Sequence, residues 1–423
     1  MNQSYILVIF VLISYTLLGP LSVKFPILGD LKPYHIALAV ASIVLCLIII
    51  SSPRSVYRSL PILVVRFWGL YLVFLIVITM SAFKGLDFGK SYSLWRNYVA
   101  NLFLVTLVAL TIKHERQINV VLYTLLGITI IGAILGGLQA VASPRISLAY
   151  LVGGERWLME HGFSPVGYAH MPYKFGNDML VGFLPALSLF LGYGLSIERS
   201  KIVQFLLFLL ILVLILGGLV LSLGLTSLMG SAVGAIYIAH KFRVFYKKII
   251  LIPVTFIIFI GILFSQKIIT WLVNTYTSYQ DILNRWHLVL AGLQMLETSP
   301  LTGIGLANFS ALSPRYLLKV SDRIIVTSPH NIFLEILVEN GVIGLFLYLI
   351  IWWYAFRACS LSDIISLKNS NLKFIGIGLR GTLIGYAVDA LFHNYTFDNH
   401  LWLIIGLCLS VGNLVLSSKS EFI

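Results

Sequence analysis

The amino-acid sequence predicts an all-α, polytopic membrane protein that forms a single membrane domain over residues 1–423. Of its residues, 59% are hydrophobic and only 11% are charged. A soluble domain needs about a quarter of its residues charged to cover its surface. The chain also has repeated apolar runs of about 20 residues, the length of a helix that crosses a bilayer. We therefore expect the lipid bilayer, and not water, to cover most of the protein surface.

The apolar runs predict helices rather than the strands of a β-barrel. Barrel strands alternate over about ten residues, whereas these runs are continuous, and a helix satisfies its own backbone polar groups in lipid. The first run has no basic residue before it, so it is interpreted as a span and not as a cleaved secretory signal. About twelve spans are expected on length. They lie near 4–23, 35–51, 61–80, 97–112, 118–142, 177–196, 202–222, 227–240, 249–265, 331–356, 374–391 and 401–416.

The net charge of +13 indicates orientation rather than nucleic-acid binding. With the N-terminus inside, Lys and Arg concentrate in the short inner connections, as the positive-inside rule requires. Both termini are then cytoplasmic, and no nucleic-acid partner is expected. The inner residues are Arg54, Arg58, Lys113, Arg116, Arg199, Lys201, Lys241, Arg243, Lys247, Lys248, Arg357, Lys368, Lys373 and Lys419.

Two longer segments are expected on the outer face. The smaller covers 143–176 and the larger covers 266–330, directly before the tenth span. Long loops are usually functional or disordered, and the aromatic residues of the larger loop favour a folded structure. The sequence therefore predicts a partly helical large outer loop that carries the function.

Neither a metal nor a cofactor is expected. The three cysteines, Cys46, Cys359 and Cys408, lie in or beside apolar runs without metal-ligand spacing. The outer loops also lack a carboxylate motif such as Asp-x-Asp. No cofactor-binding or metal-binding residue is predicted.

The large loop contains a helical pattern that begins near Arg285. Trp286, Val289, Leu293 and Leu296 recur at helical spacing and form one apolar stripe. This stripe favours a short helix on the membrane surface, which starts near Arg285 and stops before Pro300. Arg285 then either anchors the helix among lipid headgroups or binds a ligand.

A second pattern surrounds the start of the tenth span. Gly303 and Gly305 form a GxG, which by itself indicates a plain turn. His330 follows Pro329 at the helix start, where it is either structural or a general base near neutral pH. Asn331, Glu335 and Glu339 are four residues apart and share a face. Glu335 and Glu339 either orient His330 or a sugar hydroxyl, or cap buried polar groups on neighbouring helices.

The ordered set of these motifs resembles the O-antigen ligase and polymerase superfamily, most densely over 205–350. It comprises Arg285-Trp286, Pro300-x-x-Gly303-x-Gly305, Asn308-Phe309, His330-Asn331-x-x-Leu334-Glu335 and Glu339-x-Gly341-x-x-Gly344. The resemblance implies a GT-C-type glycosyltransferase in the bacterial inner membrane, with a periplasmic active site. It implies a metal-independent, inverting transfer from an undecaprenyl-diphosphate-linked glycan to an acceptor glycolipid. His330 then helps to deprotonate the acceptor and Arg285 binds the donor diphosphate; a chain-length regulator is a further candidate partner.

The chain departs from the family pattern at one turn. Family members commonly carry a second Arg where this sequence reads Ser222-Leu223-Gly224-Leu225-Thr226-Ser227. The candidates to complete the diphosphate site are Arg156, Lys174 and Arg96. Arg380 is interpreted as structural, whereas Asp389, His393 and Asp398 approach the outer face and are candidates to line the same site.

Three functions stay open at this point. The leading one is a polymerase of O-antigen or exopolysaccharide, and the second is an O-antigen ligase that transfers to lipid A core. A lipid-linked sugar flippase or transporter is the alternative from another class, which Glu335 and Glu339 within a span would favour. Transporters usually bind near the membrane midplane, whereas the candidate groups here cluster at the outer boundary.

Overall fold

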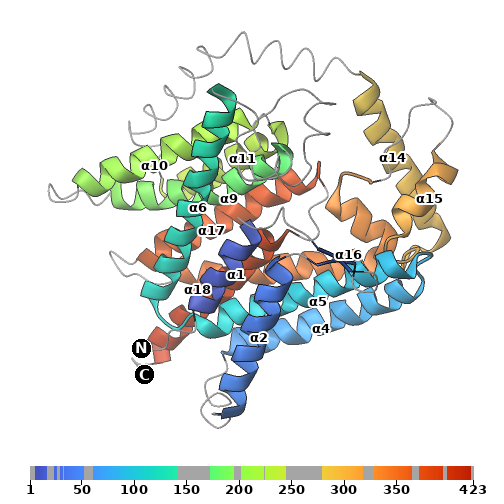
Figure 1. Cartoon of the computed structure of the whole chain (residues 1–423), viewed down its shortest axis with the longest axis horizontal. Coiled ribbons are helices and arrows are strands. Elements are labelled where there is room, and N and C mark those ends of the chain that lie inside the picture. The colour runs from blue at the N-terminus through green and yellow to red at the C-terminus, as the bar shows by residue number, and fades with distance from the viewer. Residues whose placement is uncertain are drawn as a thin grey trace.

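The computed structural model describes residues 5–16, 23–25, 29–31, 33–51, 61–141, 172–194, 202–222, 224–243, 279–317, 328–363, 371–393 and 398–420. Within these ranges the chain is almost entirely helical (Figure 1). The helices are α1 (Ile6–Thr16), α2 (Pro33–Ser51), α4 (Ile62–Phe83), α5 (Phe88–Thr111), α6 (Glu115–Val141), α9 (Pro172–Gly194), α10 (Ile202–Leu221), α11 (Leu225–Lys241), α14 (Tyr279–Thr298), α15 (Asn308–Tyr316), α16 (Ile332–Ser360), α17 (Asn371–Ala390) and α18 (Asn399–Ser420).

The predicted multi-pass membrane architecture is confirmed in its main features. Among the described residues, 6 helices are long and apolar enough to cross a membrane: α4, α5, α6, α9, α16 and α18. Each predicted span coincides at least in part with a helix, except 249–265, which lies outside the described ranges. The total of twelve spans stays a prediction.

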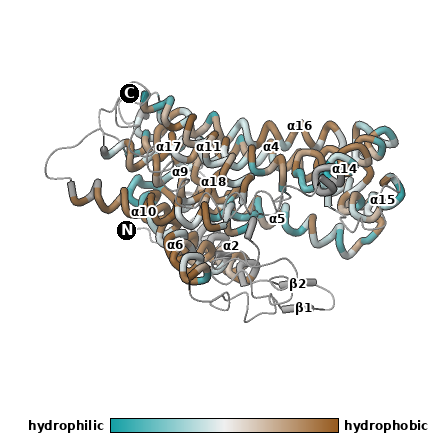
Figure 2. Tube along the Cα trace, turned by 90° about the horizontal axis from the view of Figure 1, so that it is seen from above, coloured by the Kyte–Doolittle hydropathy of each residue, from teal (hydrophilic) through white to brown (hydrophobic). Residues whose placement is uncertain are grey.

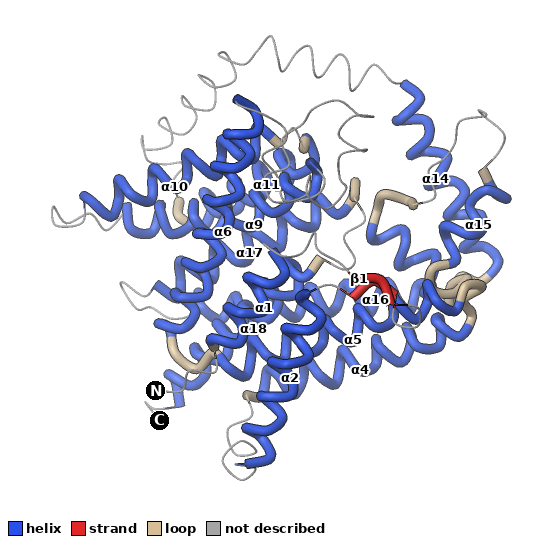
Figure 3. The backbone as a smooth tube through the Cα atoms, in the orientation of Figure 1, coloured by secondary structure: helices blue, strands red, loops and turns tan. Residues whose placement is uncertain are grey.

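The prediction of a purely helical protein needs a small correction. Strands β1 (Val23–Phe25) and β2 (Gly29–Leu31) pair antiparallel, with Val23 opposite Leu31 (Figure 3). This short hairpin lies between α1 and α2, where the sequence predicted the end of the first span and a connection. It leaves the helical architecture unchanged.

An aromatic cluster joins α4, α5, α16 and α18. Tyr71 is fully buried and packs edge-on against Trp402, with ring centroids 5.5 Å apart. Its hydroxyl donates to the carbonyl oxygen of Tyr98 at 2.9 Å. Phe74 packs edge-on against Tyr98, and Tyr348 packs against Trp402. A buried phenol with a backbone acceptor can lie in an apolar core without an unpaired donor.

Glycines bring α11 and α17 into close contact. A Cβ atom added at Gly230 would lie 2.4 Å from the carbonyl oxygen of Gly385, so only glycine permits this approach. Small residues at such crossings let membrane helices pack backbone to backbone. The contact brings the start of α11 next to the C-terminal part of α17.

The two helices of the large loop lie at one end of the bundle. α14 and α15 are at the right in Figure 1, beside the end of α4 and the starts of α5 and α16. Figure 2 shows hydrophobic residues along α4 and α16 and more hydrophilic ones around α15. We call this the His330 end of the molecule.

Candidate functional site

Helix α16 is interrupted at Gly341. This residue has φ 71° and ψ −176°, which is far from helical. The break leaves the carbonyl groups of Val338 and Glu339 and the N–H groups of Val342 and Ile343 without partners inside the helix. The continuous tenth span that the sequence predicted is therefore two helical segments.

The segment 299–307 pairs with this break, and we call it the latch. Ile304 N–H donates to Val338 O at 3.0 Å, and Gly305 N–H donates to Glu339 O at 3.1 Å. In the other direction, Val342 N–H donates to the carbonyl oxygen of Pro300 at 2.9 Å. The two glycine motifs of the sequence are therefore one interlocked backbone structure, which is more than the plain turn that the GxG predicted.

Positive φ angles make glycine necessary in the latch. Gly303 has φ 70° and Gly305 has φ 109°. A Cβ atom at Gly303 would lie 2.3 Å from the backbone carbonyl of Glu339. The latch is also fastened to α4, because Leu306 N–H donates to Ser81 O at 3.0 Å.

Arg285 lies in the second turn of α14, later than the helix start at which the sequence placed it. The helix begins earlier, at Tyr279. The side chain is exposed, and its Nη1 donates to the carbonyl oxygen of Phe392 at 3.2 Å. Phe392 follows α17, so this bond brings α14 to the end of α17, where His393 is the next residue.

His330 directly precedes Asn331, the N-cap of α16, as the sequence predicted. It has a left-handed backbone with φ 48°, an uncommon conformation for a non-glycine residue that is enriched at functional sites. The structure thus brings together three basic residues from three separate segments: Arg285, His330 and His393.

The electrostatics of this cluster keep both histidines neutral. Burial, and then the positive charge of Arg285, lower the pKa of His330 below its usual value. Burial, Arg285 and His330 together lower the pKa of His393 to about 3. A neutral imidazole has a free lone pair at pH 7. The cluster therefore combines one permanent cation with two histidines in the neutral form.

Two of the three predicted polar residues on α16 act as caps. The side chain of Asn331 accepts from Leu334 N–H at 3.0 Å and caps α16. Glu339 is buried, and its Oε1 accepts from Phe309 N–H at 3.1 Å at the start of α15. Glu335 is half-buried and interacts electrostatically with Glu339. Asn331 and Glu339 thus shape the loop, and for Glu339 capping was one of the two roles that the sequence left open.

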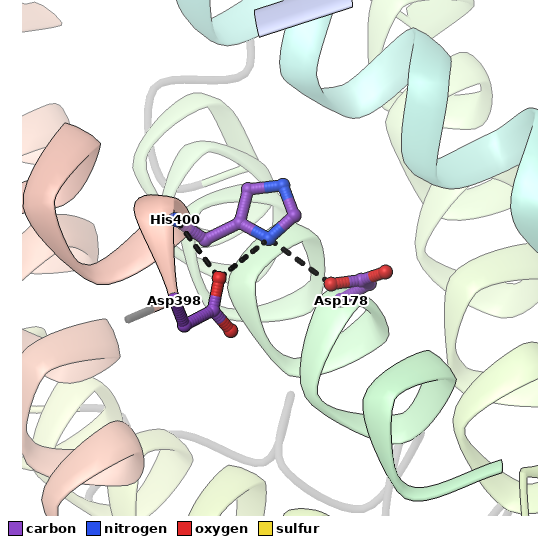
Figure 4. Close-up of side chains that lie close together, drawn as sticks. All are labelled: Asp178, Asp398 and His400. Carbon is purple, nitrogen blue, oxygen red and sulfur yellow. Dashed lines mark hydrogen bonds and ion pairs between the residues drawn. The ribbon is translucent and has the colours of Figure 1, made fainter. Parts of the chain in front are cut away.

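Lys174 lies in an ionic cluster at the start of α9 and α18. Figure 4 shows the other ionisable members, Asp178, Asp398 and His400, which are buried. Its Nζ is 3.2 Å from both Asp178 Oδ1 and Asp398 Oδ2. His400 Nδ1 lies 3.0 Å from Asp178 Oδ1 and 3.4 Å from Asp398 Oδ1. Lys174 is therefore bound to two carboxylates here, and Asp398 faces this cluster.

The same cluster contains the one group of metal-ligating side chains found among the described residues: Asp178, Asp398 and His400. Lys174 and the amide of Asn177 already contact the Asp398 carboxylate. The positive charge of Lys174, together with that of His400 when protonated, balances the two aspartates. These three residues are where a cation would bind, in competition with Lys174.

The turn that lacks the second Arg faces Asp389. The hydroxyl of Ser227 donates to Asp389 Oδ1 at 3.2 Å, and Lys174 also interacts electrostatically with Asp389. Lys174 is thus a cation close to the turn where the second Arg was expected, but its charge is already neutralised by nearby aspartates. Asp389 lies between the ionic cluster and the start of α11.

The remaining predicted residues lie elsewhere. Arg96 is half-buried in α5. Arg156 and most of the 143–176 loop are outside the described ranges. Arg380 is buried and makes a two-point ion pair with Asp363, with Nη1 at 2.8 Å from Oδ2. This pairing agrees with the structural interpretation of Arg380.

The sequence-based prediction missed Asp178 and His400. Asp178 is one turn after Lys174, at i,i+4 spacing, and His400 is two residues after Asp398. The sequence shows both residues as charged or titratable groups at the start of an apolar run, and this was the signal that could have identified them. Nothing in the spacing alone showed that these two edges meet.

Together these features define a multi-pass membrane protein in which Arg285, His330 and His393 gather at one end of the helical bundle. Residues 180–349 match the family model described as O-antigen ligase, and this match supports the O-antigen ligase/polymerase superfamily that the motifs predicted. Members of this family are glycosyltransferase-like enzymes. The matched segment contains Arg285, the latch, His330 and the break in α16. No curated protein matches the chain.

Proposed function

We propose that the protein is a bacterial inner-membrane polysaccharide polymerase. It transfers a glycan from undecaprenyl diphosphate to a sugar hydroxyl of a lipid-linked repeat unit at the periplasmic face. The observation that carries this proposal is the cluster of Arg285, His330 and His393 at the end of the bundle where α14 and α16 meet. The positive-inside rule assigns this end to the periplasm.

The reaction requires a base and an anion-binding group. The acceptor hydroxyl attacks the anomeric carbon of the donor and loses its proton to His330. The bond from that carbon to the diphosphate oxygen breaks, and the leaving lipid diphosphate keeps the electron pair. Attack from the face opposite the leaving group inverts the anomeric configuration.

The cluster suits these two tasks. A neutral His330 can accept the proton, and its lowered pKa keeps the base form present at neutral pH. Arg285 can place two N–H donors on a phosphate, and its exposed side chain is accessible from outside. The diphosphate is stable as an anion, so charge stabilisation matters more than proton donation. We propose no metal in this step.

The second candidate is the ligase, which uses the same chemistry with lipid A core as acceptor. The family description O-antigen ligase favours it directly. The missing second Arg at Thr226 favours the polymerase, on the view that ligases are the more uniform group. A flippase is less well supported, because the three basic groups lie at one end of the bundle and not at its midplane.

The discriminating experiment supplies both acceptors to one purified preparation. Full-length protein in nanodiscs receives the undecaprenyl-diphosphate-linked repeat, with either lipid A core or a second lipid-linked repeat as acceptor. A ladder of lengthened lipid-linked chains is the expected product, and His330→Ala should abolish it. Exclusive transfer to core would assign the ligase instead. Transfer to neither acceptor, combined with movement of the lipid-linked glycan between leaflets, would reject both transferases.

A further inference from the structure

A basic cavity lies at the opposite end of the molecule from His330. It has a volume of about 630 Å³ and is lined by the last turns of α11 and α16, the first turn of α4, and Arg380. The second segment of α16 runs from Val342 beyond Arg357 and rises about 1.5 Å per residue, so Arg357 lies roughly 20 Å beyond the break at Gly341. It is therefore separate from the proposed glycosyl-transfer site.

The cavity carries excess positive charge. Three cations line it, Lys241, Arg357 and Arg380, against one carboxylate, Asp363. Arg380 and Lys241 both pair with Asp363, and Lys241 Nζ lies 3.0 Å from Oδ2. Both oxygens of Asp363 are thus engaged. Asp363 is the one carboxylate that pairs with these cations within the described residues, so an anion in the cavity would meet an excess of positive charge.

Arg357 is the cation most available to a ligand. It is exposed, and no carboxylate within the described ranges lies at ion-pair distance from it. Its guanidinium carbon lies 5.9 Å from the ring centroid of Trp353, which orients the planar group. Trp353 is itself 60% exposed, on a helix long and apolar enough to span the membrane. Tryptophan at such a position is typical of the membrane–water interface.

We propose that this cavity binds the phosphate of an anionic phospholipid headgroup, between Lys241 and Arg357. Basic pockets between membrane helices on the cytoplasmic side are suited to such headgroups, and Arg357 matches phosphate geometry. The aromatic lining offers apolar surface to the glycerol and upper acyl chains. Arg380 and Asp363 pair with each other in the cavity lining, whereas the exposed side chains of Lys241 and Arg357 contact the phosphate in this proposal.

Native mass spectrometry of delipidated, full-length protein tests the proposal. The protein is incubated with phosphatidylglycerol or phosphatidylcholine, and the retained lipid is counted. The wild type should retain phosphatidylglycerol at least about tenfold better than phosphatidylcholine, since each basic residue near an anionic lipid contributes about 1 kcal/mol. The variant Lys241→Ala/Arg357→Ala should lose this preference. It leaves Arg380 and Asp363 paired, and its unchanged melting temperature would verify folding.

A matched control removes two charges from the same end outside the cavity. Lys113→Ala/Arg116→Ala removes one exposed cation just before α6 and one in its first turn, and should keep the phosphatidylglycerol preference. Equal retention of both lipids by the wild type would overturn the proposal. So would an unchanged preference in the Lys241/Arg357 variant.

A second arm separates a lipid from a soluble source of phosphate. Protein in phosphatidylcholine nanodiscs is titrated with inorganic phosphate while its melting temperature is followed. No response, with the lipid preference present, supports a headgroup site. Stabilisation of the wild type but not of the double variant, with competition against phosphatidylglycerol, supports the same phosphate site filled from solution. A response that is equal in both proteins would contradict phosphate binding at these residues.

Discussion

Arg285 on α14 donates a hydrogen bond of 3.2 Å to the backbone carbonyl of Phe392, 107 residues further along the chain. This contact fixes the candidate phosphate ligand against the turn that carries His393. Arg285 thereby gains a defined position although its side chain is exposed.

Arg285→Ala should lower kcat of glycosyl transfer by about 10²–10³, the usual effect of removing one donor that stabilises developing charge. Arg285→Lys keeps the charge but loses the planar fork, so its activity should be intermediate. Transfer assays with purified protein measure both. Arg315→Ala removes an exposed cation from the neighbouring helix α15 and serves as the control. Full activity of Arg285→Lys would show that two-point binding is not required.

The pH dependence of kcat should report on His330. The base form is active, and burial and Arg285 both lower the pKa of His330. Activity should therefore fall only when the pH drops below about 6.5, the ordinary histidine value. Arg285→Ala removes one of the two causes, so the acid limb of the residual activity should move to higher pH. An acid limb that stays in place in this variant would argue against His330 as the titrating base.

His393 should make stability depend on pH. Its pKa is about 3 in the folded protein and about 6.5 when unfolded, so the unfolded state binds the proton more readily. Its contribution is fully present above about pH 6.5 and is lost progressively as the pH falls toward the folded value. The melting temperature of His393→Gln should therefore fall less between pH 7 and pH 5 than that of the wild type. Parallel curves for the two proteins would contradict this placement.

The break in α16 should tolerate no side chain at Gly341, because the latch packs against this residue. A Cβ atom there would lie 2.2 Å from Leu301 O, and φ is positive. Gly341→Ala should lower the free energy of unfolding by about 1–3 kcal/mol, the cost of a strained backbone conformation, and reduce activity. Gly69→Ala is the matched control, because nothing lies within 4 Å of its added Cβ. Equal melting temperatures for both variants would refute the interlocked arrangement.

A chelator should leave activity unchanged if Lys174 compensates the carboxylates of Asp178 and Asp398. Purified protein is treated with EDTA and assayed with donor and acceptor. Activity that is lost and then restored by a divalent ion would contradict metal independence. In that case Asp398→Asn should abolish the restoration, because Asp398 belongs to the one candidate ligand group in the described parts of the chain.

Sequence reasoning located most of the helices because apolar runs of membrane length carry a strong signal. It also placed His330 correctly before α16, since the Pro329 boundary is local. It could not foresee that α16 breaks at Gly341, because the break depends on hydrogen bonds from the distant latch. The sequence could not predict the ionic cluster for the same reason. Its residues, Lys174, Asp178, Asp398 and His400, lie at the starts of α9 and α18, and the contact between these helices depends on tertiary packing.

The latch joins α14 directly to the break in α16 through backbone atoms. The helix with Arg285 and the helix that starts beside His330 are therefore held together by backbone hydrogen bonds. The side chains of Arg285, His330 and His393 take no part in these bonds. If Arg285 and His330 have the proposed roles, their spacing is set before a substrate arrives, and little binding energy is needed to align them. Under the proposed function, selection among acceptor sugars must come from groups outside α14, the latch and the start of α16, so substitutions elsewhere can change acceptor preference and leave the proposed reaction centre intact.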